Sequence, residues 1–188
     1  SMTSNSQTWS QYWMAQGDAW HLSIFRILWN IFHIGFALYV LRWTLLEFRL
    51  PTLPYPSLLS IFALQSWQWT VFLTGIHFVL ALLLLCGWNT RLIQVLIALS
   101  ATALFFRTLS LYHNHYAFYL CVTWYMTLVS SERFYSLDAY RKKRLLTKSD
   151  FSEWQHQPVA LLGQRLILLQ LSLLYMFAGL NKMDPSWF

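Results

Sequence analysis

The sequence predicts an all-α, polytopic integral membrane bundle of about five transmembrane helices, with one additional interfacial helix. Hydrophobic residues make up 57% of the 188 residues and charged residues only 11%, whereas soluble domains average about 45–50% apolar and about 25% charged residues. A soluble chain of this size has too much surface for its volume to bury so much apolar material. We therefore expect the lipid bilayer to be its first partner.

Five segments are long and apolar enough to cross a bilayer, which takes about 20 residues of helix. Each segment must be helical, because lipid offers no hydrogen-bond partner to an open backbone. The predicted spans are residues 22–43, 69–88, 92–111, 115–129 and 162–183.

The connections between these spans differ in character. Three prolines, Pro51, Pro54 and Pro56, interrupt the chain after the first span, and residues 57–68 form the candidate interfacial helix. Residues 87–91 are predicted to form a tight turn, and residues 131–161 the longest polar connection.

The domain organisation is simple. We expect residues 1–20 to be a tag remnant with an N-terminal segment, and residues 21–188 to form one membrane domain that is truncated at its C-terminus. The two cysteines, Cys86 and Cys121, lie in apolar runs, which indicates small hydrophobic residues and not a disulfide.

Basic residues set the expected orientation. Six of the 13 lysines and arginines fall between Arg133 and Lys148, which predicts that the 131–161 loop and the N-terminus are cytoplasmic. The same crossings bring His115 and Lys182 to the extracytoplasmic face of the cell membrane. No basic stripe interleaved with aromatic residues suggests nucleic-acid binding.

Lys182 is the first candidate for chemistry. It ends the last apolar segment, and on a helix it shares a face with Tyr175, Ala178 and Gly179. The small residues Ala178 and Gly179 permit close approach of another helix there. A desolvated lysine loses its proton more easily and can act as a general base. The competing interpretation is an interfacial lysine that reaches out to water.

A second polar cluster, His113, Asn114 and His115, precedes the fourth span. Polar groups at the rim of a span are candidates for substrate contacts or proton transfer, or they cap the helix. Arg26, Arg107 and Arg165 lie near span ends, where we expect their side chains to extend to water. The six histidines show no metal-ligand spacing, so no metal is expected.

Several segments together resemble a known family. They are His21–Arg26, Leu85–Gly87 with Thr90–Arg91, Asn114–Tyr116, Ser136–Ala139, and Tyr175-x-x-Ala178-Gly179 through Lys182 to Trp187. Their order resembles the membrane domain of vitamin K-dependent gamma-glutamyl carboxylase and its bacterial relatives, the HTTM domain proteins. One departure is that Asn181 stands where the mammalian motif has a second lysine.

The resemblance implies a chemistry. In that family, reduced vitamin K (the hydroquinone) is oxidised by O2 to an epoxide, and this drives the addition of CO2 to glutamate in a peptide or protein. Lys182 matches the family's catalytic base, and Asn114 and His115 match its polar pair. The resemblance thus implies that Lys182 and His115 are catalytic. The expected quinone-binding residues are Asn114, Tyr175 and Gly179. The alternative is a non-catalytic HTTM membrane module that binds lipid or quinone, or supports peptide maturation or export. A small channel or transporter has less support, because its sites usually lie at broken helices.

Overall fold

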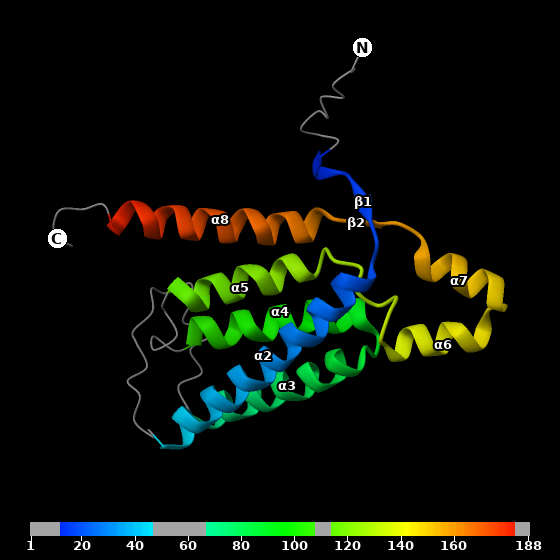
Figure 1. Cartoon of the computed structure of the whole chain (residues 1–188). Helices are drawn as coiled ribbons and strands as arrows, with labels where there is room; N and C mark the ends of the chain where they lie inside the picture. The colour runs from blue at the N-terminus through cyan, green and yellow to red at the C-terminus, as the bar shows by residue number, and fades with distance from the viewer. Residues whose placement is uncertain (1–11, 47–66, 108–113, 183–188) are drawn as a thin grey trace, which may run out of the picture.

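The computed structural model describes residues 12–46, 67–107 and 114–182, and these residues form a helical bundle (Figure 1). The main helices are α2 (Trp20–Leu46), α3 (Trp67–Cys86), α4 (Thr90–Arg107), α5 (Asn114–Met126) and α8 (Leu162–Lys182). Two short helices, α6 (Leu137–Leu145) and α7 (Lys148–His156), and two strands, β1 (Gln16–Gly17) and β2 (Val159–Ala160), complete the described part.

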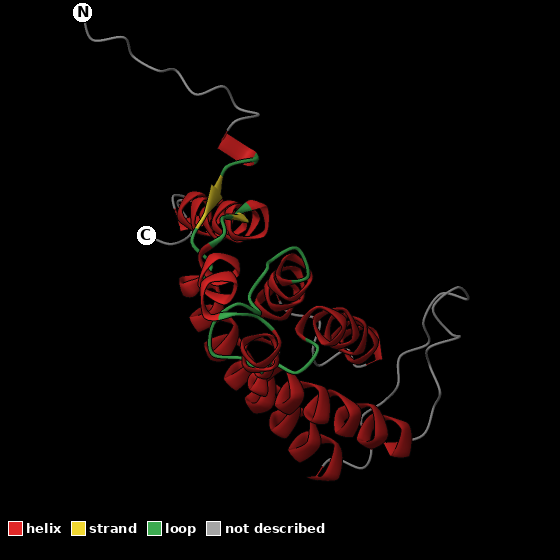
Figure 2. Ribbon diagram, turned by 90° about the vertical axis from the view of Figure 1, so that its right-hand side faces the viewer, coloured by secondary structure: helices red, strands yellow, loops and turns green. Residues whose placement is uncertain are grey.

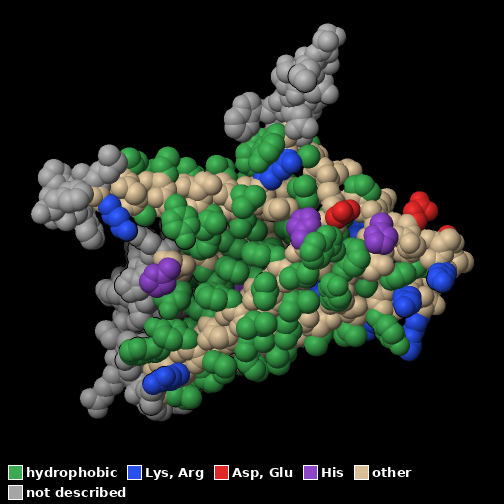
Figure 3. Space-filling model, in the orientation of Figure 1, with side chains coloured by type: hydrophobic (Ala, Val, Ile, Leu, Met, Phe, Trp, Pro, Cys, Tyr) green, Lys and Arg blue, Asp and Glu red, His purple; other side chains and the backbone are tan. Residues whose placement is uncertain are grey.

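The helices fit a membrane. Three of them contain apolar stretches long enough to cross a bilayer, Trp20–Leu45, Gln68–Cys86 and Leu162–Leu180, and α4 carries a shorter apolar stretch, Thr90–Phe106. Hydrophobic side chains cover the side of the bundle, whereas charged ones gather over α6 and α7 (Figure 3). The predicted all-α membrane bundle is confirmed. Most of the predicted interfacial helix, residues 57–66, lies outside the described residues, and the remaining two residues belong to α3, which begins at Trp67.

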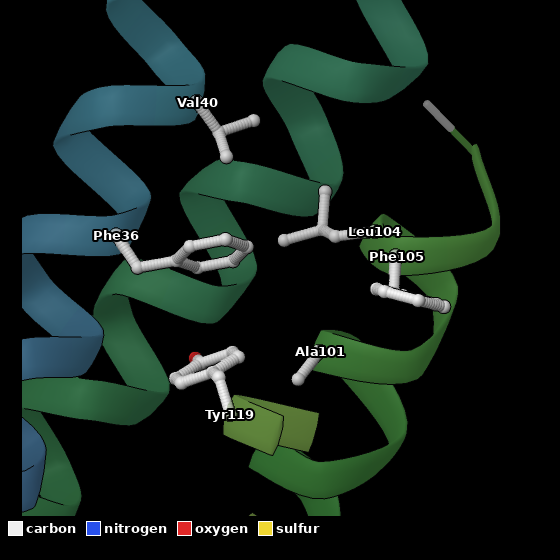
Figure 4. Close-up of a cluster of buried hydrophobic side chains, with 6 residues drawn as sticks. All are labelled: Phe36, Val40, Ala101, Leu104, Phe105 and Tyr119. Carbon is white, nitrogen blue, oxygen red and sulfur yellow. The ribbon is translucent and has the colours of Figure 1, made fainter. Parts of the chain in front are cut away.

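Apolar side chains from three helices form the core near the far end of α2. The buried members are Phe36 and Val40 from α2, Ala101, Leu104 and Phe105 from α4, and Tyr119 from α5. The Tyr119 ring lies beside that of Phe36, with 4.7 Å between ring centroids. Its hydroxyl points away from Ala101 (Figure 4). Tyr119 therefore presents an apolar ring to this core and a polar group to another part of the interior.

The last helix, α8, packs alongside α5 at the edge of the bundle. The closest approach is at Gly163, where an added Cβ would lie 2.5 Å from Val129 Cγ2 and 2.6 Å from the Tyr125 carbonyl oxygen. At Gly179 an added Cβ would meet no heavy atom within 4 Å. The expectation that Gly179 permits close helix packing is therefore wrong for the described residues, since the small residue that does so stands at the other end of α8.

The 131–161 connection is more structured than its polar composition suggests. It contains α6 and α7, whose N-caps Ser136 and Thr147 accept hydrogen bonds from backbone N–H groups of their first turns. Its end pairs with the N-terminal segment, because Gln16 and Gly17 lie opposite Ala160 and Val159 in an antiparallel ladder. Figure 2 shows the two strands at one edge of the bundle, where β1 leads into α2 and β2 leads into α8.

The ends of the helices divide the bundle into two poles. One end of the bundle contains the start of α2 together with α6 and α7, and we call this end the loop pole (Figure 1). Helix α5 begins at Asn114 and α8 ends at Lys182 at the opposite end. The chain therefore brings these two segments, far apart in sequence, to one end of the bundle.

Candidate functional site

A groove of about 630 Å³ runs between α5 and α8. Its lining is mostly apolar, with Phe118 and Phe177 among the aromatic side chains, and includes the polar groups of His115 and Gln170. Ligand pockets in proteins commonly span about 300–1,000 Å³, with an apolar lining and few polar groups. The groove therefore has the size and composition of a site for a largely apolar ring with one or two oxygen atoms.

The predicted site residues fall on different parts of this groove. His115 lines it directly, together with Ala178 from the facing helix. Lys182 comes one helical turn after Ala178, on the same side of α8, and its side chain is exposed. Tyr175 is 68% exposed, and Gly179 has open space beside its Cα. Neither is among the lining residues, and Asn114 begins α5 at the same pole.

Three of the family-like segments meet at the loop pole, where they hold helices together. The Asp138 carboxylate accepts hydrogen bonds from the Asn89 backbone N–H at 2.9 Å, from the Thr90 N–H at 2.7 Å and from the Thr90 hydroxyl at 2.9 Å. The Asp138 N–H in turn donates to the Gly87 carbonyl at 3.1 Å. The first N–H groups of a helix have no partner within the helix, and the helix dipole favours negative charge at this end. The Asp138 carboxylate therefore stabilises the start of α4.

Arg26 belongs to the same pole, and its predicted exposure to water is wrong. The side chain is fully buried, and its Nη2 donates to the Tyr135 carbonyl at 2.6 Å. Gly87, at φ +69°, fits beside it because a Cβ there would lie 2.4 Å from Arg26 Nη1 and 2.3 Å from Ser136 Cβ. We call Arg26, Gly87, Ser136 and Asp138 the loop-pole clamp.

Other polar expectations have mixed outcomes. Gln94 links α4 to the 131–161 connection, since its Nε2 donates to the Ser131 hydroxyl at 3.0 Å. Arg165 is half-buried, and its guanidinium lies over the Tyr12 ring at 3.9 Å. Both cysteines are free thiols, as the sequence predicts. These contacts are structural and lie outside the groove.

A buried polar cluster in the bundle interior is the feature that sequence reasoning missed. His33 Nδ1 lies 3.1 Å from His77 Nε2, and His77 Nδ1 lies 2.8 Å from the Ser100 hydroxyl. The Tyr119 hydroxyl contacts both imidazoles. Four helices thus contribute one side chain each to this cluster, and none is more than 8% exposed.

A sequence signal for this cluster did exist. Ser23, Arg26, Asn30 and His33 recur at helical spacing in an otherwise apolar segment, which places them on one face. Polar or ionisable residues inside a span are expensive in lipid, so each is a candidate functional group. His33 and His77 meet only through tertiary packing, and their pairing does not follow from spacing in the sequence.

The fold and groove together define an integral membrane helical domain with a ligand-sized site between two of its helices. A family model for the HTTM domain matches residues 15–188, so the chain belongs to the HTTM domain family. This domain is a membrane module of the carboxylase family that the sequence motifs resemble. Comparison with curated proteins and with solved structures found no match.

Proposed function

We propose that this protein is a vitamin K-dependent, carboxylase-like membrane enzyme that binds a reduced quinone in the groove between α5 and α8. The observation that carries the proposal is that His115 and Ala178, from two distant motifs, line one groove, and that Lys182 follows Ala178 by one helical turn. The reaction class comes from the resemblance and from membership of the HTTM family.

The residues of the groove fit such a molecule. A naphthoquinol is a flat apolar ring system with two oxygen atoms on opposite edges and an apolar tail. Phe118 and Phe177 offer aromatic surface for the ring, and His115 and Gln170 offer hydrogen-bonding groups for its oxygens. The leucines Leu173 and Leu174 on α8 offer apolar surface for the tail. When bound, reduced vitamin K would be oxidised by O2, and this oxidation would provide a base strong enough to deprotonate a glutamate side chain, to which CO2 then adds.

The chain's own residues then have separate tasks. With the quinone bound, Lys182 would be the group that takes the proton of a ring hydroxyl at Nζ, because its flexible side chain begins one turn beyond the groove lining. His115 holds the same end of the ring by a hydrogen bond from its imidazole. Asn114, at the start of α5, lies at the pole where Lys182 ends α8. Tyr175 and Gly179 belong to the adjoining face of α8, outside the groove lining, and contribute least in this proposal.

The proposed orientation places the loop pole in the cytoplasm and the Lys182 end outside. The support is the exposed basic side chains of α6, among them Arg141, Lys142, Lys143 and Arg144. A cysteine introduced at position 143 in a background without Cys86 and Cys121 should react with an impermeant maleimide only after the membrane is opened. Labelling of intact cells would reverse the orientation.

The enzyme proposal is tested by incubating the purified protein in lipid nanodiscs with reduced vitamin K and O2. The epoxide is measured by chromatography for wild type, Lys182→Ala and the matched control Lys143→Ala on α6. We expect epoxide from wild type and from the control, and at least a tenfold lower rate from Lys182→Ala, because one general base contributes about 10²–10⁴-fold. Absence of epoxide from folded wild type contradicts the enzyme proposal. An unchanged rate in Lys182→Ala keeps the enzyme and removes the lysine as its base.

A second candidate is a non-catalytic module that binds lipid or quinone, or that supports peptide maturation or export. It is favoured by the exposure of Lys182 and Tyr175, which the described residues leave uncovered. This candidate expects a saturable fluorescence change on quinone addition without any epoxide. The same nanodisc preparation distinguishes the two candidates.

A further inference from the structure

One face of α2 carries polar atoms that are buried without a partner. Arg26, Asn30 and His33 are at most 1% exposed. Within the described part of the chain, no hydrogen bond reaches Arg26 Nε and Nη1, Asn30 Oδ1 or His33 Nε2. We call these three residues the α2 polar stripe. From Arg26 to His33 the stripe runs about 10 Å along the helix, at 1.5 Å per residue.

The neighbours of the stripe add complementary atoms. Trp29 Nε1 on α2 and Gln94 Oε1 on α4 are also buried and have no partner among the described residues. The donors are therefore Arg26 and Trp29, and the acceptors are Asn30 and Gln94, with an imidazole nitrogen at His33. An unsatisfied buried polar group costs about 1–3 kcal/mol. Buried groups of this kind are normally bridged by internal water, which makes two to four hydrogen bonds at each site.

The far end of the stripe enters the cluster of His33, Tyr119, His77 and Ser100, whose protons can be assigned. The Ser100 hydroxyl donates to the Ile97 carbonyl at 3.0 Å, so His77 Nδ1–H must donate to Ser100 and His77 Nε2 is an acceptor. Tyr119 O–H then donates to His77 Nε2, and His33 Nδ1–H donates to the Tyr119 oxygen. In this assignment His33 Nε2 carries a lone pair and has no partner among the described residues.

We propose that the bundle interior holds a chain of ordered water that leads from the loop pole along the α2 polar stripe to a proton-binding site formed by His33, Tyr119 and His77. A proton from this water binds His33 Nε2. His33 Nδ1–H passes its proton to Tyr119 as the Tyr119 hydroxyl proton moves to His77 Nε2. The result is a neutral His33, an intact Tyr119 hydroxyl and a protonated His77, and the reverse steps return the proton to water.

Several elements contribute the titratable, charged and polar groups near this site. Arg26 on α2 is the nearest basic group along the stripe, and the carboxylates of Glu132 and Asp138 act on Arg26 at the loop pole. Helix α3 contributes His77, α5 contributes Tyr119, and α4 contributes the non-titrating side chains Gln94 and Ser100. The site is separate from the α5/α8 groove, since none of these residues lines it. This proposal does not depend on the proposed enzyme activity.

The water is tested by hydroxyl-radical footprinting with X-ray pulses on the protein in nanodiscs, in which bound water labels the side chains beside it. His33 and Tyr119 are the reporters, and the buried Met126, in an apolar cluster that contains neither reporter, is the dry control. We expect the reporters to be oxidised at least about fivefold faster than Met126, although methionine reacts readily, because only the reporters adjoin internal water. Rates equal to or below that of Met126 would overturn the proposal.

Two variants locate the water. Asn30→Leu replaces the middle of the stripe with an apolar side chain of similar size, and we expect it to reduce oxidation of His33 at least about threefold. Thr44→Val alters another buried polar group on α2, beyond the end of the stripe, and should leave the labelling unchanged. An equal effect of both variants would contradict a path along α2. Where Asn30→Leu does not fold, the wild-type comparison with Met126 decides alone.

The proton relay is tested by deuterium exchange at the imidazole C2 positions, followed by mass spectrometry across pH. Exchange at this carbon requires a protonated ring, so it reports which histidine takes up the proton. In Tyr119→Phe we expect slower exchange at His77 with little change at His33. Equal changes at both histidines, or no exchange at either in wild type, would contradict the relay.

Discussion

The two poles of the bundle use their polar residues in opposite ways. At the loop pole, Arg26 and Asp138 are hydrogen-bonded, and Gly87 leaves no room for a side chain. At the opposite pole, the groove between α5 and α8 is open, its polar side chains are spread out, and Lys182 is exposed. One pole is packed tightly and the other leaves space for a ligand.

The family-like motifs therefore have different roles at the two poles. The segments around Arg26, Gly87 and Asp138 hold three parts of the chain in register, so changes there should lower stability. The segments around His115 and Lys182 border a groove, so changes there should affect ligand binding while the fold is kept. A motif shared with an enzyme family is therefore not by itself a catalytic residue.

The largest effect is expected for Gly87→Ala, which would break the loop-pole clamp. The new Cβ collides with Ser136 and Arg26, and the positive φ of 69° disfavours any side chain. Together these effects should lower the free energy of unfolding by about 3 kcal/mol. The measurement is thermal unfolding in detergent.

Gly75→Ala in α3 is the matched control, because an added Cβ there meets nothing within 4 Å. It should change stability by less than about 1 kcal/mol, in the stabilising direction. Equal melting temperatures for the two variants would contradict the tight packing assigned to the loop pole.

Filling the groove is the complementary change. Ala178→Trp places a large ring among the lining residues and should raise the Kd for a naphthoquinone at least about tenfold, or about 1.4 kcal/mol, with the fold retained. Leu180→Trp is the control, because Leu180 is exposed and does not line the groove. Quinone titration followed by tryptophan fluorescence gives both values, and unchanged binding in Ala178→Trp would mean that the ligand sits elsewhere.

A smaller loss is expected for Asp138→Ala. It removes the carboxylate that accepts from Asn89 and Thr90, so the start of α4 loses its cap. Caps of this kind contribute about 1 kcal/mol, to be read from the shift in melting temperature. Asp150→Ala in the exposed first turn of α7 should shift it less, and a larger shift there would reverse the assignment.

The smallest loss of stability is expected for Arg91→Ala, which changes an exposed ion pair near the loop-pole clamp. Arg91 pairs with Glu132 at 3.2 Å, but the Arg91 side chain is 70% exposed. Exposed pairs contribute about 0–1 kcal/mol, so Arg91→Ala should cost about 0.5 kcal/mol and respond weakly to salt. A loss as large as that of Gly87→Ala would show that the clamp extends to this pair.

Much of the fold could be predicted from the sequence because the bilayer imposes a simple rule on it. Apolar length alone placed the helices that became α2, α3 and α8, since a chain in lipid has no alternative to helix. The turn at Gly87 could also be predicted. The pairing of Gln16 with Ala160 could not, because two-residue strands carry no periodicity.

The candidate site was only partly predictable for a similar reason. His115 and Lys182 were placed at one pole by counting spans, and α5 does begin and α8 does end there. Which face of α8 packs on α5 depends on Gly163, more than two turns away from Tyr175. The His33–His77 cluster joins residues 44 positions apart, so only tertiary packing reveals it. Arg26 was wrongly predicted to be exposed, because its position near a span end gives no information about its hydrogen-bond acceptor. That acceptor is the Tyr135 carbonyl, 109 positions away in the sequence.

The position of a bound quinone decides whether the α5/α8 groove is the ligand site. A photoreactive naphthoquinone, cross-linked in nanodiscs and mapped by mass spectrometry, can distinguish the α5/α8 groove from a second groove of about 420 Å³ lined by Phe32, Phe36 and Tyr116. We expect adducts on peptides that contain His115, Cys121 or Phe177, competed away by unlabelled quinone and reduced in Ala178→Trp. Competed adducts confined to Phe32, Phe36 and Tyr39 would place the ligand on α2 and contradict the proposed site.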